Sequence, residues 1–368
     1  MIKIDVVSLF SGGGGLDLGF KNEGYNLVWA IDNNPNAIAT YKKNIHENAI
    51  CGDINEINLD DIPKADVIIG GPPCQSFSLA GNRNVEDARG QLVWRYLEII
   101  EHVQPKAFVF ENVTGLLSAK NSNKEHIIEL LKQAFRDRGY TINAKVLNAV
   151  EYGVPQKRKR VIIVGLRNGE TFDFPLPTHG EADGLLPYVS VEEALGDLPA
   201  AVVDENARVK YLTEAKNGYQ KLMRKNAGED VSEHFISKLS ELDKYIIKHV
   251  KPGGNYMDIP ADVKSERIRR LQRDGGHTTC YGRLRPECPS YTINTYFNRP
   301  NVGCNIHYSE QRLITVREAL RLQSFPDDFE IVSTSKQGRN LIVGNAVPPI
   351  LAGVIAKKLR EYLEGEND

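Results

Sequence analysis

The chain has 368 residues, of which 41% are hydrophobic and 26% are charged, and its formal net charge is −2 at pH 7. This composition is typical of a globular protein, and the length allows two domains with sizeable cores. The five cysteines are odd in number and lack zinc-ligand spacing, which argues against a disulfide framework and against a structural metal site. The sequence contains no bilayer-length apolar run and no signal-peptide pattern at the amino terminus, so we expect a cytoplasmic protein.

A glycine-rich turn follows the first predicted strand. Residues 6–10 form that strand, and glycines occupy positions 12–15 before a helical apolar pattern. Such a turn lets a ligand approach the backbone and presents free N–H groups at a helix amino terminus. The same pattern is shared by many nucleotide-binding proteins, and it could equally be a flexible turn.

The second and third strands each end in an acidic residue. Asp32 ends the strand 27–31, about 20 residues after the glycines, which is the spacing of a carboxylate that binds ribose hydroxyls. Asp32 could also cap the helix that begins at Pro35. Asp53 and Ile54 follow the third strand, where they could meet an adenine, although a simple turn is favoured by these residues alone.

The fourth strand, 65–69, leads directly into Gly70-Gly71-Pro72-Pro73-Cys74. The two prolines stiffen the backbone and keep Cys74 out of a helix. Because ligands bind at the carboxyl ends of strands in open α/β sheets, Cys74 lies where chemistry is expected. The glycine-bracketed segment 79–90 follows, and we predict either a mobile lid or an ordinary exposed loop.

Charged residues flank the next strands as well. Glu111 ends the apolar strand 107–110, where a carboxylate is costly without a partner, so we favour a functional role for it. The basic segment 152–160 precedes the seventh strand and places Arg158 and Arg160 on one face of an extended chain. The alternative is a solvated run of charges.

The alternation of strands and helices stops near residue 176. Residues 176–310 are rich in turns and carry basic clusters at 208–225 and 264–273, which suit phosphate contacts or any loop-rich accessory domain. Regular structure resumes at Leu313, with a capping box from Thr315 to Glu318. We expect one domain over 1–175, a second over 176–310, and a return to the first over 311–368, with a terminal helix that brings Asn345 near Gly12.

Six short motifs occur in the order found in the DNA (cytosine-5) methyltransferases, and the chain resembles that family nearly throughout, outside 176–310. The motifs are Phe10-x-Gly12-x-Gly14, Gly71-Pro72-Pro73-Cys74-Gln75, Glu111-Asn112-Val113, Gln156-x-Arg158-x-Arg160, Arg317-Glu318-Ala319 and Gly344-Asn345-x-Val347-x-Pro349. The resemblance implies an α/β fold, a Rossmann-like class I methyltransferase sheet of about seven strands, doubly wound, with a smaller loop-rich target-recognition domain over 176–310.

The resemblance also implies a reaction and a set of site residues. S-adenosyl-L-methionine would donate a methyl group to carbon 5 of a flipped-out cytosine in double-stranded DNA and leave as S-adenosyl-L-homocysteine, without a metal. The implied catalytic residues are Cys74, Glu111, Arg158 and Arg160. The implied cofactor-binding residues are Phe10, Gly12, Gly13, Gly15, Asp32, Asn33, Asp53, Ile54, Gly71, Pro73, Leu92 and Asn345. The expected DNA-binding residues are Ser78, Arg83, Arg89, Arg269, Arg270 and Arg273.

The expected enzyme acts as a monomer, in a restriction-modification or related system, and a cognate endonuclease would act separately. A nicotinamide-dependent dehydrogenase would share the glycine turn, but has no use for Pro-Pro-Cys-Gln. A tRNA cytosine-5 methyltransferase on the same fold is the alternative, disfavoured by the length of the region 176–310. A catalytically inactive DNA-binding protein is disfavoured because Cys74, Glu111 and Arg160 occur together.

Overall fold

The computed structural model describes residues 2–73, 90–121, 123–333 and 335–365. These residues form two compact units. The first contains Met1–Asn148, Lys159–Leu176 and Pro349–Asp368, and the second contains Ala149–Arg158 and Pro177–Pro348. Helices α9 (Val316–Leu322) and α10 (Lys336–Asn345) therefore fold with the second unit, whereas the expected return to the first domain began at residue 311.

The first unit is built on a seven-stranded sheet with the order β3-β2-β1-β4-β5-β7-β6. The sheet is parallel except for β7, which runs antiparallel to both β5 and β6. This mixed, doubly wound sheet confirms the predicted fold class. Its strands are β1 (Asp5–Leu9), β2 (Asn26–Asp32), β3 (Ala49–Cys51), β4 (Val67–Gly70), β5 (Ala107–Val113), β6 (Thr141–Asn148) and β7 (Lys159–Leu166).

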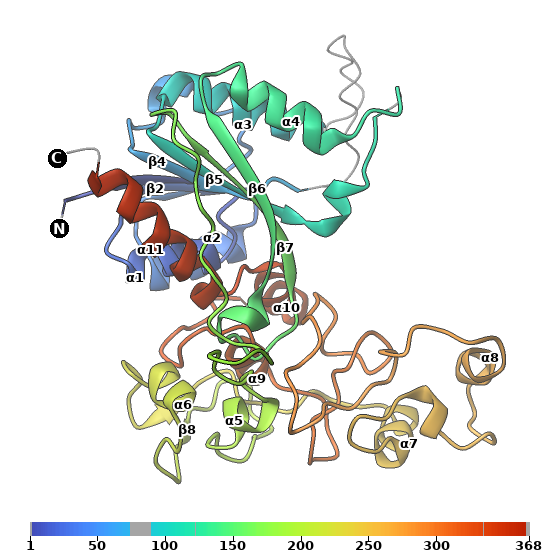
Figure 1. Ribbon diagram of the computed structural model, residues 1–368. Helices are drawn as coiled ribbons and strands as arrows, with labels where there is room; N and C mark the ends of the chain where they lie inside the picture. Colours follow the sequence, from blue (N-terminus) through green and yellow to red (C-terminus); the bar gives the residue numbers. More distant parts are fainter. Residues whose placement is uncertain (1, 74–89, 122, 334, 366–368) are drawn as a thin grey trace. The chain divides into compact units, whose positions relative to one another are not determined.

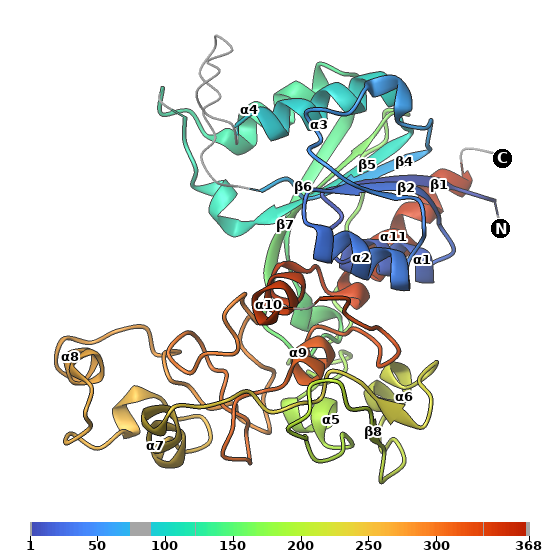
Figure 2. The same cartoon turned by 180° about the vertical axis from the view of Figure 1, so that it is seen from behind.

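Helices cover both faces of this sheet (Figures 1 and 2). One face carries α3 (Gly90–Val103) and α4 (Ile127–Arg136), and the other carries α1 (Gly15–Asn22), α2 (Pro35–Asn44) and α11 (Pro349–Gly365). Beneath α3 and α4, the rings of Tyr96, Phe108 and Phe135 pack edge to face or stacked in a core without exposed surface. The strand order reverses between β1 and β4, so their carboxyl ends form the crevice where ligands bind in such folds.

Helix α11 packs tightly on α1, at the level of Gly19. A Cβ atom at Gly19 would come within 2.4 Å of the Ala352 Cβ and 2.6 Å of the Gly353 nitrogen, so only glycine allows this approach. Contrary to expectation, one described segment, Lys336–Gly365, has the length and mean hydropathy of a membrane span. The structure divides it into α10 and α11, and 67% of its most apolar window is buried, as in a core helix.

The second unit has little regular structure. Its helices are α5 (Val191–Leu195), α6 (Gly218–Met223), α7 (Glu241–His249), α8 (Glu266–Asp274), α9 and α10, and its short strands β8 (Val209–Lys210) and β9 (Asp230–Val231) pair antiparallel. A small hydrophobic core joins α7, α8 and the segment around Ile306.

Helix α9 is held in the second unit by a capping box and by buried ion pairs. The predicted capping box of α9 is confirmed, since the Thr315 hydroxyl accepts from the Glu318 backbone and the Glu318 carboxylate accepts from Thr315. Arg321, fully buried on the same helix, pairs with Asp197 at 2.7 Å and with Asp327 at 2.6 Å. Removal of one partner of such a pair strongly destabilises a fold, because the other charge is left buried without a counter-charge.

In the first unit, a buried carboxylate joins α1 to α2 beside the glycine turn. Asp17 is completely buried and accepts a hydrogen bond of 2.9 Å from the Tyr41 hydroxyl. The Lys21 ammonium donates to the Ile45 carbonyl at 2.8 Å, which closes the far end of the same helix pair. A Cβ at Gly14 would lie 3.1 Å from Tyr41 Cδ2, so α2 supports the glycine turn directly.

The Asp17 carboxyl predicts a specific pH dependence of stability. Burial raises its pKa from 3.8 to about 6, with a smaller contribution from the charge of Asp32. Because the pKa is raised on folding, the stabilising contribution of protonated Asp17 is complete below pH 4 and is lost as the pH rises through 6. The wild type should lose stability from pH 4 to pH 7 and Asp17→Asn should not. The free energy of unfolding of the variant, relative to that of the wild type, should therefore rise by about 3 kcal/mol at most between these pH values.

Urea unfolding at both pH values, followed by tryptophan fluorescence, measures this difference. Trp29 and Trp94, the only tryptophans in the sequence, both belong to the first unit, so the signal reports on that unit. A difference between variant and wild type that is the same at pH 4 and pH 7 would contradict the assignment.

Candidate functional site

An ion pair lies at the carboxyl end of β5. The Arg160 Nε atom is 2.7 Å from Oε1 of Glu111, and each side chain is only 12% exposed. The antiparallel pairing of β5 with β7 explains the contact. Glu111 of β5 is opposite Ile162 of β7, and Val113 of β5 is opposite Arg160 of β7. Glu111 and Arg160 are thus diagonal neighbours on one face of the sheet, within reach of long side chains.

The end of β5 also contacts the segment that leads to Cys74. A Cβ at Gly71 would come within 2.6 Å of the Glu111 Oε2 atom, so this carboxylate lies against the backbone of Gly71. The neighbouring Asn112, which is 3% exposed, donates a hydrogen bond of 2.9 Å to the Pro72 carbonyl. Asn112 was not among the expected site residues, although it belongs to the Glu-Asn-Val motif.

Cys74, Ser78, Arg83 and Arg89 lie outside the described residues. Pro73, the last described residue before Cys74, is exposed. The chain on its amino-terminal side is fixed by the contacts of Gly71 and Pro72.

The glycine turn and Asp32 meet at the carboxyl ends of β1 and β2. Asp32 accepts a hydrogen bond of 2.9 Å from the Gly12 nitrogen through Oδ2, and one of 2.8 Å from the Asn34 nitrogen through Oδ1. Burial raises the pKa of Asp32, and these two hydrogen bonds oppose the rise. The amino-terminal cap of α2 is Asn34, so capping of this helix does not account for Asp32.

The glycine turn has the geometry of a ligand cradle. Gly12 has a φ of +55°, and a Cβ there would meet no atom within 4 Å. The adjacent Ser11 hydroxyl is buried and has no hydrogen-bond partner among the described residues. Gly13 and Gly15 are buried in the same turn, and Phe10 packs partly against the core. Open space, an unsatisfied hydroxyl and an oriented carboxylate fit the nucleoside part of S-adenosyl-L-methionine.

The other expected cofactor residues of the first unit have visible structural roles or are exposed. Asp53 accepts hydrogen bonds from the backbone and side chain of Asn55, which makes a turn. Ile54 is 4% exposed in the core, and Leu92 is partly buried against the same core. Asn33 is exposed.

Arg158 and Arg160 have different surroundings. Arg158 belongs to the second unit, is fully buried, and donates to the carbonyls of Ile293 at 3.0 Å and Gly344 at 2.9 Å. Gln156, also fully buried, accepts from the Ile293 nitrogen and donates to the Leu322 carbonyl. This role of Gln156 has no local signal in the sequence, because it depends on the pairing of 155–158 with the distant residues 290–293.

The remaining expected residues also lie in the second unit. Asn345 is exposed at the carboxyl end of α10, and its closeness to Gly12 stays a prediction. Arg269, Arg270 and Arg273 project from α8, with 47%, 76% and 68% of their side chains exposed. Each is within 4.0 Å of an acidic side chain of the same helix.

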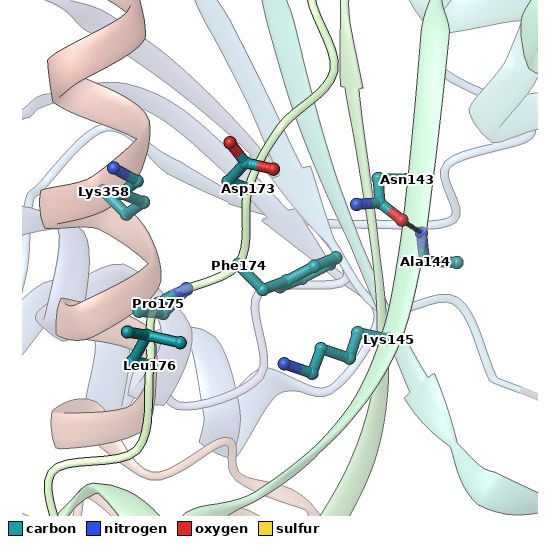
Figure 3. A pocket seen from close by; sticks show the side chains of 8 residues that line it. All are labelled: Asn143, Ala144, Lys145, Asp173, Phe174, Pro175, Leu176 and Lys358. Atoms are coloured by element: carbon teal, nitrogen blue, oxygen red, sulfur yellow. Dashed lines mark hydrogen bonds between the residues drawn. The ribbon is translucent and has the colours of Figure 1, made fainter.

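A pocket of about 660 Å³ lies elsewhere in the first unit (Figure 3). It is bounded by β6, the segment 173–176 and α11, and contains Lys145, Asp173 and Lys358. None of the expected site residues lines it.

Comparisons with known proteins identify the family. The family model of the C-5 cytosine-specific DNA methylases matches residues 4–361. The type II methyltransferase M.NgoFVII of Neisseria gonorrhoeae is 38% identical over 97% of this chain and 86% of its own length. M.FnuDI of Fusobacterium nucleatum is 35% identical over 97% of this chain and 94% of its own length.

Solved structures agree with this result. A prophage-encoded E. coli protein, assigned as a DNA modification methyltransferase, superposes with a TM-score of 0.74 and 25% identity over 98% of this chain and all of that chain. The Dnmt2 methyltransferase of S. pombe, 18% identical, has the same fold, with a TM-score of 0.60 over the full length of both chains. The chain belongs to the C-5 cytosine-specific DNA methylase family.

Proposed function

We propose that the enzyme methylates carbon 5 of a flipped-out cytosine, within a specific sequence of double-stranded DNA, through a covalent adduct with Cys74. The observation that supports this most strongly is the Glu111–Arg160 pair, whose carboxylate lies against Gly71, three residues before Cys74. We infer that the Cys74 thiol reacts at the carboxyl edge of β4 and β5, where Glu111 and Arg160 lie.

Carbon 5 of cytosine is a weak nucleophile, and covalent attack at carbon 6 activates it. The Cys74 thiolate adds to carbon 6, and the ring becomes an enamine whose electrons are directed to carbon 5. S-adenosyl-L-methionine supplies the electrophilic methyl group and is released as S-adenosyl-L-homocysteine. Water then takes the proton from carbon 5, which restores the double bond between carbons 5 and 6 and expels the Cys74 thiolate.

Glu111 and Arg160 stabilise the charge that this attack creates. In the complex with the base, the protonated Glu111 carboxyl donates to ring nitrogen 3 and accepts from the exocyclic amine, and Arg160 donates to the O2 oxygen. The ion pair with Glu111, at 2.7 Å, supports this role because it restricts the orientation of the Arg160 guanidinium. Arg158 acts as a positioning residue, because its guanidinium is buried among the carbonyls of Ile293 and Gly344.

The cofactor is assigned to the glycine turn. Asp32 holds the ribose hydroxyls, and Gly12, Gly13 and Gly15, with Phe10, bound the methionine side. The other residues assigned to the cofactor site are Gly71, Pro73, Leu92, Asn345, Asn33, Asp53 and Ile54. No metal takes part in the proposed reaction.

The target base must leave the duplex, at a cost of a few kcal/mol that protein contacts offset. We assign these contacts to Ser78, Arg83 and Arg89 after Cys74, and to Arg269, Arg270 and Arg273 on α8. The region 176–310 acts as the target-recognition domain, between catalytic segments 1–175 and 311–368. The enzyme works as a cytoplasmic monomer, and any cognate restriction endonuclease acts separately.

Replacement of the nucleophile tests the reaction. We expect Cys74→Ser to abolish methylation and to retain DNA binding, because a serine hydroxyl is scarcely ionised near neutral pH. Bisulfite sequencing of plasmid from a host that expresses the enzyme measures methylation and locates the target cytosine. Full methylation by the variant, or methylation of tRNA in place of DNA by the wild type, would contradict the proposal.

The two arginines of the Gln-x-Arg-x-Arg motif should respond differently to lysine substitution. Arg160→Lys loses the planar guanidinium that faces the base, so kcat falls by about 10²-fold or more while the melting temperature changes little. Arg158→Lys loses one of two buried carbonyl contacts, so the melting temperature falls and the kcat of the folded fraction stays within a few-fold of wild type. Equal losses of kcat in both variants would contradict this division of roles.

A further inference from the structure

Helix α8 packs against the small hydrophobic core of the second unit. Ile268 is fully buried in that core, and Leu271 packs against it. On the same side, the Gln272 amide donates to the carbonyls of Tyr256 at 3.0 Å and Ile259 at 2.6 Å. The inward face of this nine-residue helix is therefore fixed by packing and by hydrogen bonds.

The outward face of α8 carries a row of cations. Arg267, Arg270 and Arg273 are exposed and follow one another at three-residue steps, so they project from neighbouring positions of one surface. Arg269 lies beside this row and is held differently, because its guanidinium donates to the Val263 carbonyl at 3.2 Å and pairs with Glu266.

A single carboxylate faces two members of the row. Asp274 receives two hydrogen bonds from Arg273, at 2.7 Å and 3.2 Å, and lies 3.8 Å from the Nε atom of Arg270. All three side chains are at least 48% exposed. Exposed ion pairs of this kind contribute little stability, so another anion can replace the carboxylate at small cost.

We propose that α8 docks the enzyme on duplex DNA through Arg267, Arg270 and Arg273, and that Asp274 competes with DNA phosphate for two of these arginines. This inference rests on the proposed function, which makes duplex DNA the substrate. Charge complementarity favours this partner, since α8 carries four arginines against two carboxylates in a chain whose net charge is −2. A DNA phosphate that replaces Asp274 would accept charge-assisted hydrogen bonds from Arg270 and Arg273.

Two variants with opposite expected effects test the proposal. Arg267→Gln/Arg270→Gln removes two cations and should weaken binding of duplex DNA by about tenfold or more, and lower the slope of log Kd against log salt by about two. Asp274→Asn releases Arg270 and Arg273 and should strengthen binding several-fold at low salt. Arg136→Gln, which removes an exposed arginine of α4 in the first unit, is the matched control and should bind as the wild type does.

Fluorescence anisotropy with the full-length enzyme and a duplex that contains the methylated sequence, at several salt concentrations, gives these affinities. A gain of affinity in Asp274→Asn cannot arise from misfolding, so that variant keeps the test decisive. Wild-type affinity in both α8 variants, from an enzyme that methylates plasmid DNA normally, would overturn the role of α8 alone. Failure of the wild type to methylate DNA, or its tighter binding of a structured RNA, would overturn the proposed function and this inference together.

Discussion

The contact between Glu111 and Arg160 is the interaction on which the proposed active site depends. A carboxylate at the end of a buried strand needs a cation, and the single antiparallel strand β7 supplies one at the diagonal position. A parallel strand at that place would run the other way and would not bring residue 160 to the carboxyl end of β5. Because β7 is antiparallel, Arg160 near its amino-terminal end lies at the carboxyl end of β5 and adds a positive charge there.

The glycine turn and the segment that leads to Cys74 leave the sheet at the same edge. Leu9 of β1 is in register with Gly70 of β4, and Gly70 is in register with Phe110 of β5, one residue before Glu111. The glycine turn after β1 and the Cys74 segment after β4 thus leave adjacent strands at the same level. A methyl donor on the first and a cytosine on the second would meet across this crevice, which explains why the two motifs lie far apart in sequence but side by side in the sheet.

Much of this arrangement could be predicted from the sequence, because strand patterns and short motifs are local. The positions of Glu111 and Asp32 at strand ends follow from apolar runs that stop at an acid. The division between Arg158 and Arg160 could not be predicted, since it depends on carbonyls of residues 293 and 344, distant in the chain. Asp17 also gave no signal, because its burial depends on how α2 packs against α1.

In the proposed reaction, Cys74 attacks carbon 6 of a cytosine held at this edge. The most direct test of this step is mass spectrometry of the enzyme after incubation with S-adenosyl-L-methionine and duplex DNA that contains 5-fluorocytosine at the target position, where fluorine blocks the final elimination. We expect a stable adduct on the peptide that contains Cys74, with the methyl group transferred. An adduct on another cysteine, or DNA that is bound but never becomes covalently attached, would contradict it.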